Sequence, residues 1–318
     1  MYLGKEGGVP MKRFEEAASL LPSWLAQRFM ALPADIKEQA TEIRMRSDRP
    51  VSVTLRRRNA FLTRAGLSYN PDDATFLSPR ELWEVFDCLC EGSVYSCMEQ
   101  LREGYLTLRG GHRAGLAGRA VLEDGHIRNI KSVSSVNIRI ARQIKGSGEQ
   151  ACRTLMSEGA LRGALIVSPP SGGKTTMLRD MARILSCGGR RVCVVDSRGE
   201  IAACYDGVPQ NDLGPLCDVL DAYPKAAGIL QAVRTLSPEA VICDEVGGSE
   251  ECAAIVEGMN AGVPVIASAH ASSLEEALRR PQLRMLIDSG AVTWLFCLAG
   301  AAEPGKIVEI RDCRRPLA

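Results

Sequence analysis

The residues best suited to chemistry in this chain lie in the run SPPSGGKTT at 168–176. The apolar run GALIV at 163–167 leads into it, and a helical pattern begins at its Gly-Lys-Thr end. Small residues let successive backbone N–H groups point at phosphate oxygens, and the helix N-terminus adds the positive end of its dipole. The spacing predicts a phosphate-binding loop, and the alternative is an ordinary glycine-rich turn that exposes a lysine.

Each residue of this predicted loop has an expected role. Lys174 reaches the β- and γ-phosphates and the Thr175 hydroxyl holds Mg²⁺, so the expected ligands are ATP and Mg²⁺. One position departs from the pattern GxxxxGK[ST], because Ser168 stands where the first glycine is usual. The start of the loop must therefore be built differently. The expected nucleotide contacts are Pro170, Ser171, Gly172, Gly173, Lys174, Thr175 and Thr176.

A second motif, AVICDE at 240–245, has the pattern of a buried strand that ends in two carboxylates. This arrangement is typical of a Walker B strand. Asp244 is expected to hold the water shell of Mg²⁺ and Glu245 to polarise the attacking water, because phosphoryl transfer depends mostly on positioning and charge stabilisation. The alternative is a pair of solvated acids that cap a strand.

Two more segments follow predicted strands, at the carboxyl ends where open α/β sheets bind ligands. VVDSRGE at 194–200 offers Asp196 and Glu200, and VIASAH at 265–270 offers His270. We expect the acids to help order the attacking water, and His270 to sense the γ-phosphate or to bridge to a neighbouring subunit. The alternatives are two surface loop acids and a histidine that only caps its strand.

The composition is that of an ordinary soluble protein with two domains, since 46% of the 318 residues are hydrophobic and 24% are charged. The formal net charge of +1 does not indicate a nucleic-acid partner, and the cluster at 56–58 (Arg56, Arg57, Arg58) is typical of a solvated hairpin tip. The 12 cysteines are scattered through apolar patterns, so we expect reduced core residues and no metal beyond Mg²⁺. No signal-peptide pattern or bilayer-length apolar run is present, which predicts a cytoplasmic protein.

Residues 1–147 are expected to form an α+β domain. Ser78, Pro79 and Glu81 make a capping box for a helix at 79–90. Periodicity also predicts a helix across 12–40, a short helix near 96–103, strands at 41–47 and 51–55, two strands within 105–121 and one at 135–143.

Residues 148–318 are expected to form an α/β domain, because strands and helices alternate along them. Strands separated by helices imply crossover connections and a mainly parallel sheet that is buried on both faces. The predicted strands are 163–167, 191–195, 240–243, 264–269 and 292–298, and the predicted helices are about 149–158, 174–186, 223–234, 249–260 and 273–279.

The order of these motifs resembles the secretion ATPase superfamily of type II and type IV systems, which are RecA-like hexameric motors. The runs SPPSGGKTTMLRD, VVDSRGEIA, RTLSPEAVICDEVG and NAGVPVIASAHA are more similar to the stage III sporulation protein AA family of endospore-forming bacteria. The first domain agrees through EIRMRSDRP, GSVYSCMEQLREGYLTLRGGHRAGLAG and SSVNIRIAR. The resemblance therefore covers nearly the whole chain.

The resemblance implies an ATPase with a RecA-like second domain that works as a homo-oligomer, a hexamer, with membrane proteins of a channel complex between mother cell and forespore as partners. It implies nucleotide and Mg²⁺ binding by Lys174 and Thr175, a Walker B pair at 244–245, and a histidine-box role for His270. The acidic box matches loosely, because secretion motors have Glu-Asp-Pro where residues 196–198 are Asp-Ser-Arg. These motors also usually have glycine where Asp244 stands, which makes this chain more similar to an ordinary P-loop ATPase.

A motor of this kind needs cationic side chains from a neighbouring subunit at the phosphoryl transition state. Arg113, Arg139 and Arg142 of the first domain are candidates, and the alternative is that each is a structural arginine of a sheet. Two rival functions also stay open. One is a RecA-like protein that binds single-stranded nucleic acid under ATP control, and the other is a nucleotide-gated scaffold without turnover.

Overall fold

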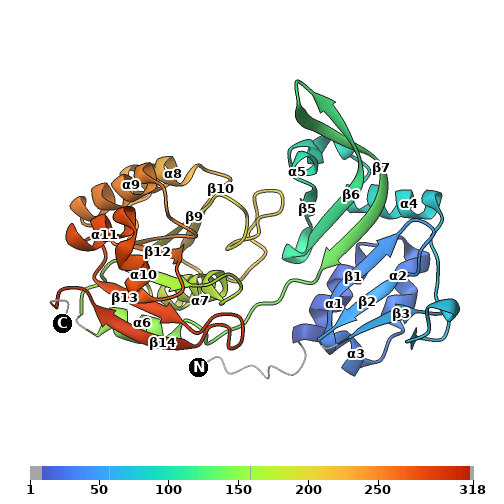
Figure 1. The fold of residues 1–318 in the computed structure, drawn as a ribbon, viewed down its shortest axis with the longest axis horizontal. Coiled ribbons are helices and arrows are strands. Elements are labelled where there is room, and N and C mark those ends of the chain that lie inside the picture. Colours follow the sequence, from blue (N-terminus) through green and yellow to red (C-terminus); the bar gives the residue numbers. More distant parts are fainter. Residues whose placement is uncertain (1–8, 57, 158, 316–318) are drawn as a thin grey trace. The chain divides into compact units, whose positions relative to one another are not determined.

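The computed structural model describes residues 9–56, 58–157 and 159–315 of the chain. They form two compact units, one up to Arg142 and one from Gln143 onward, and each unit has its own sheet (Figure 1). The division lies a few residues before the boundary expected at 147. Within the described residues, no helix is both long enough and apolar enough to cross a bilayer.

An antiparallel sheet forms the centre of the first unit, in the order β4-β3-β2-β1-β7-β6-β5. Arg56 and Arg58 lie in the short connection between Leu55 and Asn59, and the Arg58 guanidinium lies 4.0 Å from the centre of the Tyr69 ring. Arg57 lies outside the described residues. The strands are β1 (Ala40–Arg46), β2 (Ser52–Leu55), β3 (Asn59–Leu62), β4 (Leu67–Ser68), β5 (Tyr105–Thr107), β6 (Arg113–Glu123) and β7 (His126–Arg139).

The helices of the first unit differ from the prediction at the start of the chain. The single helix expected across 12–40 is wrong, because Pro22 and Pro33 each interrupt it and precede a new helix. The capping box is confirmed, since the Ser78 N–H donates to Glu81 Oε2 at 2.8 Å and the Glu81 N–H donates to Ser78 Oγ at 3.3 Å. The helices are α1 (Val9–Ser19), α2 (Ser23–Met30), α3 (Ala34–Gln39), α4 (Pro79–Leu89) and α5 (Met98–Arg102).

In the second unit the sheet order is β10-β9-β11-β12-β8-β13-β14. Neighbouring strands are parallel except for β14, which is antiparallel to β13. The strands are β8 (Ala164–Ser168), β9 (Val192–Asp196), β10 (Cys217–Asp221), β11 (Ala240–Cys243), β12 (Val265–His270), β13 (Trp294–Leu298) and β14 (Ile307–Asp312). β10 and β14, at the two edges of the sheet, were not predicted.

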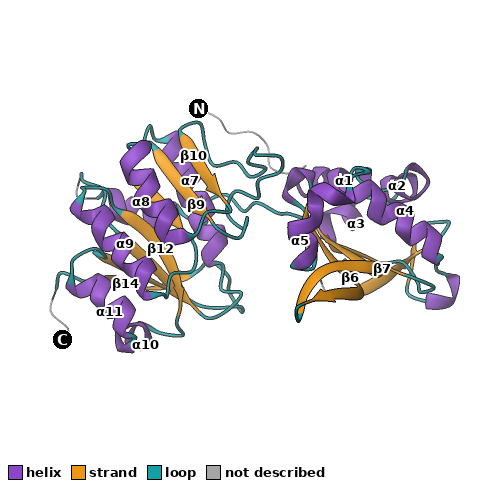
Figure 2. Cartoon of the chain, turned by 90° about the horizontal axis from the view of Figure 1, so that it is seen from above, coloured by secondary structure: helices purple, strands orange, loops and turns teal. Residues whose placement is uncertain are grey.

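Helices cover both faces of this second sheet, and the strands lie between them (Figure 2). Alternate residues of one strand point to opposite faces, so Leu165 and Val167 pack with α8–α11 whereas Ala164 and Ile166 pack with α6 and α7. Burial on both sides explains the continuous apolar runs. The helices are α6 (Glu149–Met156), α7 (Lys174–Cys187), α8 (Lys225–Thr235), α9 (Ser249–Asn260), α10 (Leu274–Arg279) and α11 (Pro281–Asp288), of which α11 was not predicted.

Candidate active site

The register of the parallel strands brings the predicted site residues to one edge of the second sheet. Ser168 at the end of β8 pairs with His270 at the end of β12. Cys243, the last residue of β11, pairs with Val195 of β9, so Asp244 emerges between the ends of neighbouring strands. Motifs that are far apart in the sequence therefore meet where α/β sheets bind ligands.

The loop between β8 and α7 turns tightly and requires two of its glycines. A Cβ on Gly172 would lie 2.3 Å from Ser168 Oγ, and a Cβ on Gly173 would lie 2.6 Å from the Gly305 nitrogen. Gly173 has φ 92°, in the left-handed region that glycine adopts without strain. The helix α7 begins at the next residue, so its unpaired N–H groups lie at the loop.

Ser168, which replaces the usual first glycine, is buried at the end of β8. Its hydroxyl donates to the carbonyl of the following residue at 2.7 Å and lies 3.3 Å from Lys174 Nζ. On the other side, the Gly305 N–H donates to the Gly172 carbonyl at 2.9 Å, so the turn between β13 and β14 supports the loop. Sequence reasoning missed this support, although the Glu-Pro-Gly run at 303–305 is a turn signal.

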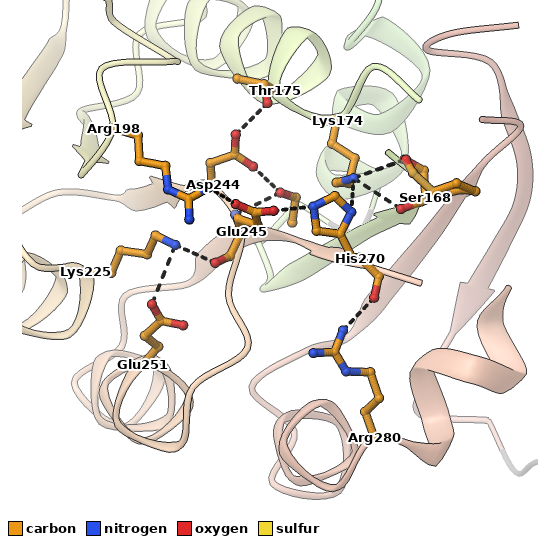
Figure 3. Close-up of polar contacts among 12 residues, drawn as sticks. Ser168, Lys174, Thr175, Arg198, Lys225, Asp244, Glu245, Glu251, His270 and Arg280 are labelled. Atoms are coloured by element: carbon orange, nitrogen blue, oxygen red, sulfur yellow. Dashed lines mark hydrogen bonds and ion pairs between the residues drawn. The ribbon is translucent and has the colours of Figure 1, made fainter. Parts of the chain in front are cut away.

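The Lys174 side chain folds back into the loop. Its Nζ lies 3.2 Å from the Ser168 carbonyl, 3.4 Å from the Pro169 carbonyl and 3.1 Å from His270 Nδ1 (Figure 3). Burial lowers the pKa of this ammonium, and the nearby carboxylates of residues 244 and 245 oppose the shift. In the described part of the chain, this buried ammonium contacts two carbonyls, a hydroxyl and a ring nitrogen, so it is well placed to bind an anion.

The first turn of α7 is joined to the end of β11 through side-chain oxygens. The Thr175 hydroxyl donates to Asp244 Oδ2 at 2.5 Å, and the Ser268 hydroxyl donates to Asp244 Oδ1. Hydroxyl and carboxylate oxygens are the ligands that Mg²⁺ prefers. Ser268 was not singled out from the sequence, although it lies within the VIASAH run, because its role depends on the pairing of β11 with β12.

Both carboxylate oxygens of Glu245 are engaged (Figure 3). Oε1 contacts His270 Nε2, and Oε2 accepts a hydrogen bond from Arg198. The His270 carbonyl in turn accepts from Arg280 at 2.6 Å. His270 therefore links Glu245 to Lys174 through its two ring nitrogens. A histidine that only capped its strand would need neither of these side-chain contacts.

The backbone of Glu245 is also held by neighbouring side chains. Its φ of 51° is left-handed, and its N–H donates to Ser268 Oγ at 3.0 Å. Its carbonyl accepts from Lys225 Nζ, which lies 3.6 Å from Glu251 Oε1. Lys225 is the first residue of α8, and no local sequence signal points to this role.

Asp196 has a different place from the one predicted. Its buried carboxylate accepts backbone N–H groups of Glu200, Ile201 and Ala202 at 2.9, 3.0 and 2.7 Å. Burial raises the pKa of this carboxyl, and the three hydrogen bonds oppose the rise. The alternative of a surface loop acid is therefore wrong, because Asp196 is buried and closes the turn that carries Arg198.

One pocket of about 430 Å³ collects these groups. The loop provides backbone N–H groups and Lys174 for phosphate oxygens, and Thr175 and Asp244 provide metal ligands, so the residues fit a nucleoside triphosphate with Mg²⁺. The lining consists of Pro170, Ser171, Gly172, Gly173, Lys174, Thr175, Thr176, Arg198, Glu200, Asp244, Glu245, His270 and Pro304. Glu200 is thus at the pocket, as predicted, whereas Asp196 lies beneath its turn.

The three arginines considered as partners of the transition state lie in the first unit and contact its own sheet. Arg142 donates to two backbone carbonyls, at residues 38 and 40, at 2.7 and 2.6 Å. Arg139 Nε lies 3.7 Å from Glu42 Oε1, and the Arg113 guanidinium lies 3.7 Å from the centre of the Tyr105 ring. All three contact residues of their own unit, which is what the structural alternative predicts.

Comparison with known proteins identifies the family. Residues 12–316 match the model described as Sporulation stage III, protein AA. The chain belongs to this family. Stage III sporulation protein AA of Bacillus subtilis (strain 168) is 38% identical over 302 residues, which cover 93% of this chain and 94% of that protein. Protein SEEDLING PLASTID DEVELOPMENT 1 of Arabidopsis thaliana is 32% identical over 180 residues, 55% of this chain and 26% of that protein.

Solved structures of an ATPase and of a pilus retraction motor are similar in fold to this stage III sporulation protein AA family member. The ATPase DotB of Legionella pneumophila has a TM-score of 0.53 at 18% identity, and the match covers 90% of this chain and 74% of that chain. The pilus retraction motor PilT with bound ADP has a TM-score of 0.54 at 13% identity, and the match covers 83% of this chain and 75% of that chain. Likeness at these identities concerns the fold, while function depends on the site.

Proposed function

We propose that this chain is an ATPase that works as an oligomeric motor and that its second unit is a RecA-like domain. The observation that carries this proposal is the convergence of Lys174, Thr175, Asp244 and Glu245 on one pocket at the carboxyl edge of a parallel sheet. The pocket combines a phosphate cradle, a pair of metal ligands and a carboxylate beside them. These are the groups that hydrolysis of a nucleoside triphosphate needs.

Each residue has a defined role in this reaction. The loop N–H groups and Lys174 bind the phosphates. Thr175 and Asp244 would hold Mg²⁺, which when bound would supply positive charge that neutralises the phosphate oxygens. Glu245 orients a water molecule that attacks the γ-phosphorus and accepts its proton. The bond from the γ-phosphorus to the bridging oxygen breaks, and ADP and phosphate leave. His270 positions the Glu245 carboxylate.

The family and the fold also support a proposal for the assembly. We infer a homo-oligomeric ring, a hexamer, that works in the cytoplasm beside a membrane and binds membrane proteins of a sporulation channel complex between mother cell and forespore. ATP hydrolysis drives motion of the two units and so energises that complex. Membership of the family and the likeness of the fold to DotB and PilT support this inference.

Steady-state ATP hydrolysis at increasing protein concentration tests the proposal. We expect specific activity to rise with concentration as rings assemble, and to be lost in Lys174→Ala, which lacks the phosphate ligand, and in Glu245→Gln, which lacks the base. Activity that is independent of concentration would contradict an oligomeric motor. Membrane partners are added in a parallel series to detect stimulation.

One observation favours a second candidate, a nucleotide-gated scaffold without turnover. Arg198 and His270 each hold one oxygen of Glu245, which restrains this carboxylate from turning toward a water molecule. The scaffold predicts that ATP raises the Tm of the protein but is not cleaved, even with membrane partners present. Phosphate release under those conditions excludes it.

A further inference from the structure

Arg198 is an exposed side chain with an unusual position. It lies on the turn after β9, and its guanidinium reaches Glu245 Oε2 although 64% of the side chain is accessible to solvent. Asp196 anchors this turn through three backbone hydrogen bonds. Arg198 also lines the same pocket as the phosphate-binding loop. The turn that carries Arg198 is thus held in place by hydrogen bonds, and the long cationic side chain lies within the pocket that phosphates would enter.

The contacts of Glu245 form a continuous chain across the pocket, from Lys174 through His270 and Glu245 to Arg198. A lysine ammonium has no acceptor, so His270 Nδ1 accepts from Lys174 and Nε2 carries the proton directed at Glu245. Both oxygens of the Glu245 carboxylate are thus held by side chains, one on each side of the pocket. The arrangement therefore restrains the group that must activate water.

We propose that Arg198 is a positioning residue that exchanges one anion for another. It holds the Glu245 carboxylate when the pocket contains no nucleotide or a diphosphate, and it turns to the terminal phosphate when a triphosphate binds. Guanidinium groups bind phosphate through two parallel hydrogen bonds, so the terminal phosphate is a strong competitor for a half-solvated ion pair. The exchange frees one Glu245 oxygen for water. This inference rests on the proposed function.

The test is a set of dissociation constants for MgADP and for a non-hydrolysable ATP analogue with Mg²⁺, measured by calorimetry. The proteins are the full-length wild type, Arg198→Ala, Glu245→Gln and the double variant. We expect Arg198→Ala to weaken binding of the analogue about tenfold, because two hydrogen bonds to phosphate are lost and one to Glu245 no longer has to be broken, and to leave the MgADP constant unchanged. We expect Glu245→Gln to tighten the analogue, because Arg198 is then free, and to do so only when Arg198 is present.

An alternative explanation is that Glu245→Gln acts only by removing a negative charge near the phosphate. This explanation makes the opposite prediction for the double variant. Without the arginine, the Glu245 carboxylate repels the terminal phosphate fully, so Glu245→Gln would then tighten the analogue at least as much in the Arg198→Ala background. That result would overturn the exchange. Arg198→Lys keeps the charge without the planar fork, and we expect it to restore only part of the affinity.

Arg234→Ala is the matched control. Arg234 is 67% exposed and lies 3.1 Å from Glu257, so it resembles Arg198 in exposure and pairing but does not line the pocket. It should leave both constants unchanged. If the wild type binds neither nucleotide, both the proposed function and this inference fail. If it binds both and Arg198→Ala changes them equally, only this inference fails.

Discussion

Thr175 Oγ1 and Asp244 Oδ2 lie 2.5 Å apart, which joins the first turn of α7 to the residue that follows β11. The Ser268 hydroxyl holds the other oxygen of the same carboxylate. The two prospective metal ligands are therefore oriented toward each other by the fold itself.

Thr175→Ala should reduce the dependence of nucleotide binding on Mg²⁺. The variant loses one oxygen ligand but keeps Lys174 and the loop N–H groups, so weak metal-independent binding of ADP should persist. Titration calorimetry with and without EDTA measures this. Thr175→Ser keeps the hydroxyl and should restore the metal dependence. Equal Mg²⁺ dependence in Thr175→Ala and the wild type would exclude Thr175 as a ligand.

Gly172→Ala should destabilise the second unit by about 1–3 kcal/mol, because the new Cβ would lie 2.3 Å from Ser168 Oγ and 3.2 Å from the Gly300 Cα. Nucleotide binding should weaken as the loop shifts. Adding Ser168→Gly removes the nearer clash and should recover part of the stability in thermal unfolding. A double variant no more stable than Gly172→Ala alone would show that the packing against Ser168 is not the cause.

Lys225→Ala should lower the turnover number about tenfold or more and leave the nucleotide dissociation constants close to wild type. The lysine supports the carbonyl of Glu245 in its left-handed conformation, and Glu245 acts in the chemical step rather than in binding. Single-turnover rates separate the two effects. Lys145→Ala removes an exposed lysine paired with Asp212 at 3.0 Å and serves as the control.

The lowered pKa of His112 predicts how the free energy of unfolding depends on pH. Burial lowers its pKa from 6.5 to about 4, and the nearby Arg13 adds to the shift. Between these values the unfolded chain binds a proton that the folded chain does not, so stability should fall as pH drops from 6.5 toward 4, by up to about 3 kcal/mol. His112→Asn keeps an acceptor for the Ala141 N–H, which bonds Nδ1 at 3.0 Å, and should show a flatter dependence in calorimetry.

Buried elements of the fold were predictable, whereas edge elements were not. β8, β11 and β12 are covered on both faces, so their sequences are continuous apolar runs that a single-chain pattern reveals. β10 (CDVLD) and β14 (IVEIRD) lie at the sheet edges and carry acidic residues. These residues interrupt the apolar run, so the sequence pattern does not indicate a buried strand. At the start of the chain, helical periodicity continued across two prolines that end the helices.

The site shows the same division between local and long-range information. Gly172, Gly173, Lys174 and Thr175 are neighbours in sequence, so their spacing alone indicates a phosphate-binding loop. The roles of Ser268 and Lys225 depend on which strands and helices lie side by side, which no local pattern contains. The backbone partners of Asp196 could not be predicted, because the sequence pattern of an acid after a strand is the same whether it contacts water or backbone N–H groups.

Single-turnover cleavage tests the central claim most directly. Excess protein is mixed with γ-labelled ATP and Mg²⁺, and bound ATP and released phosphate are followed over time for the wild type and Glu245→Gln. We expect the wild type to convert bound ATP to ADP and phosphate, and Glu245→Gln to bind ATP and retain it uncleaved. Wild-type protein that retains ATP uncleaved, with membrane partners present, would contradict the account.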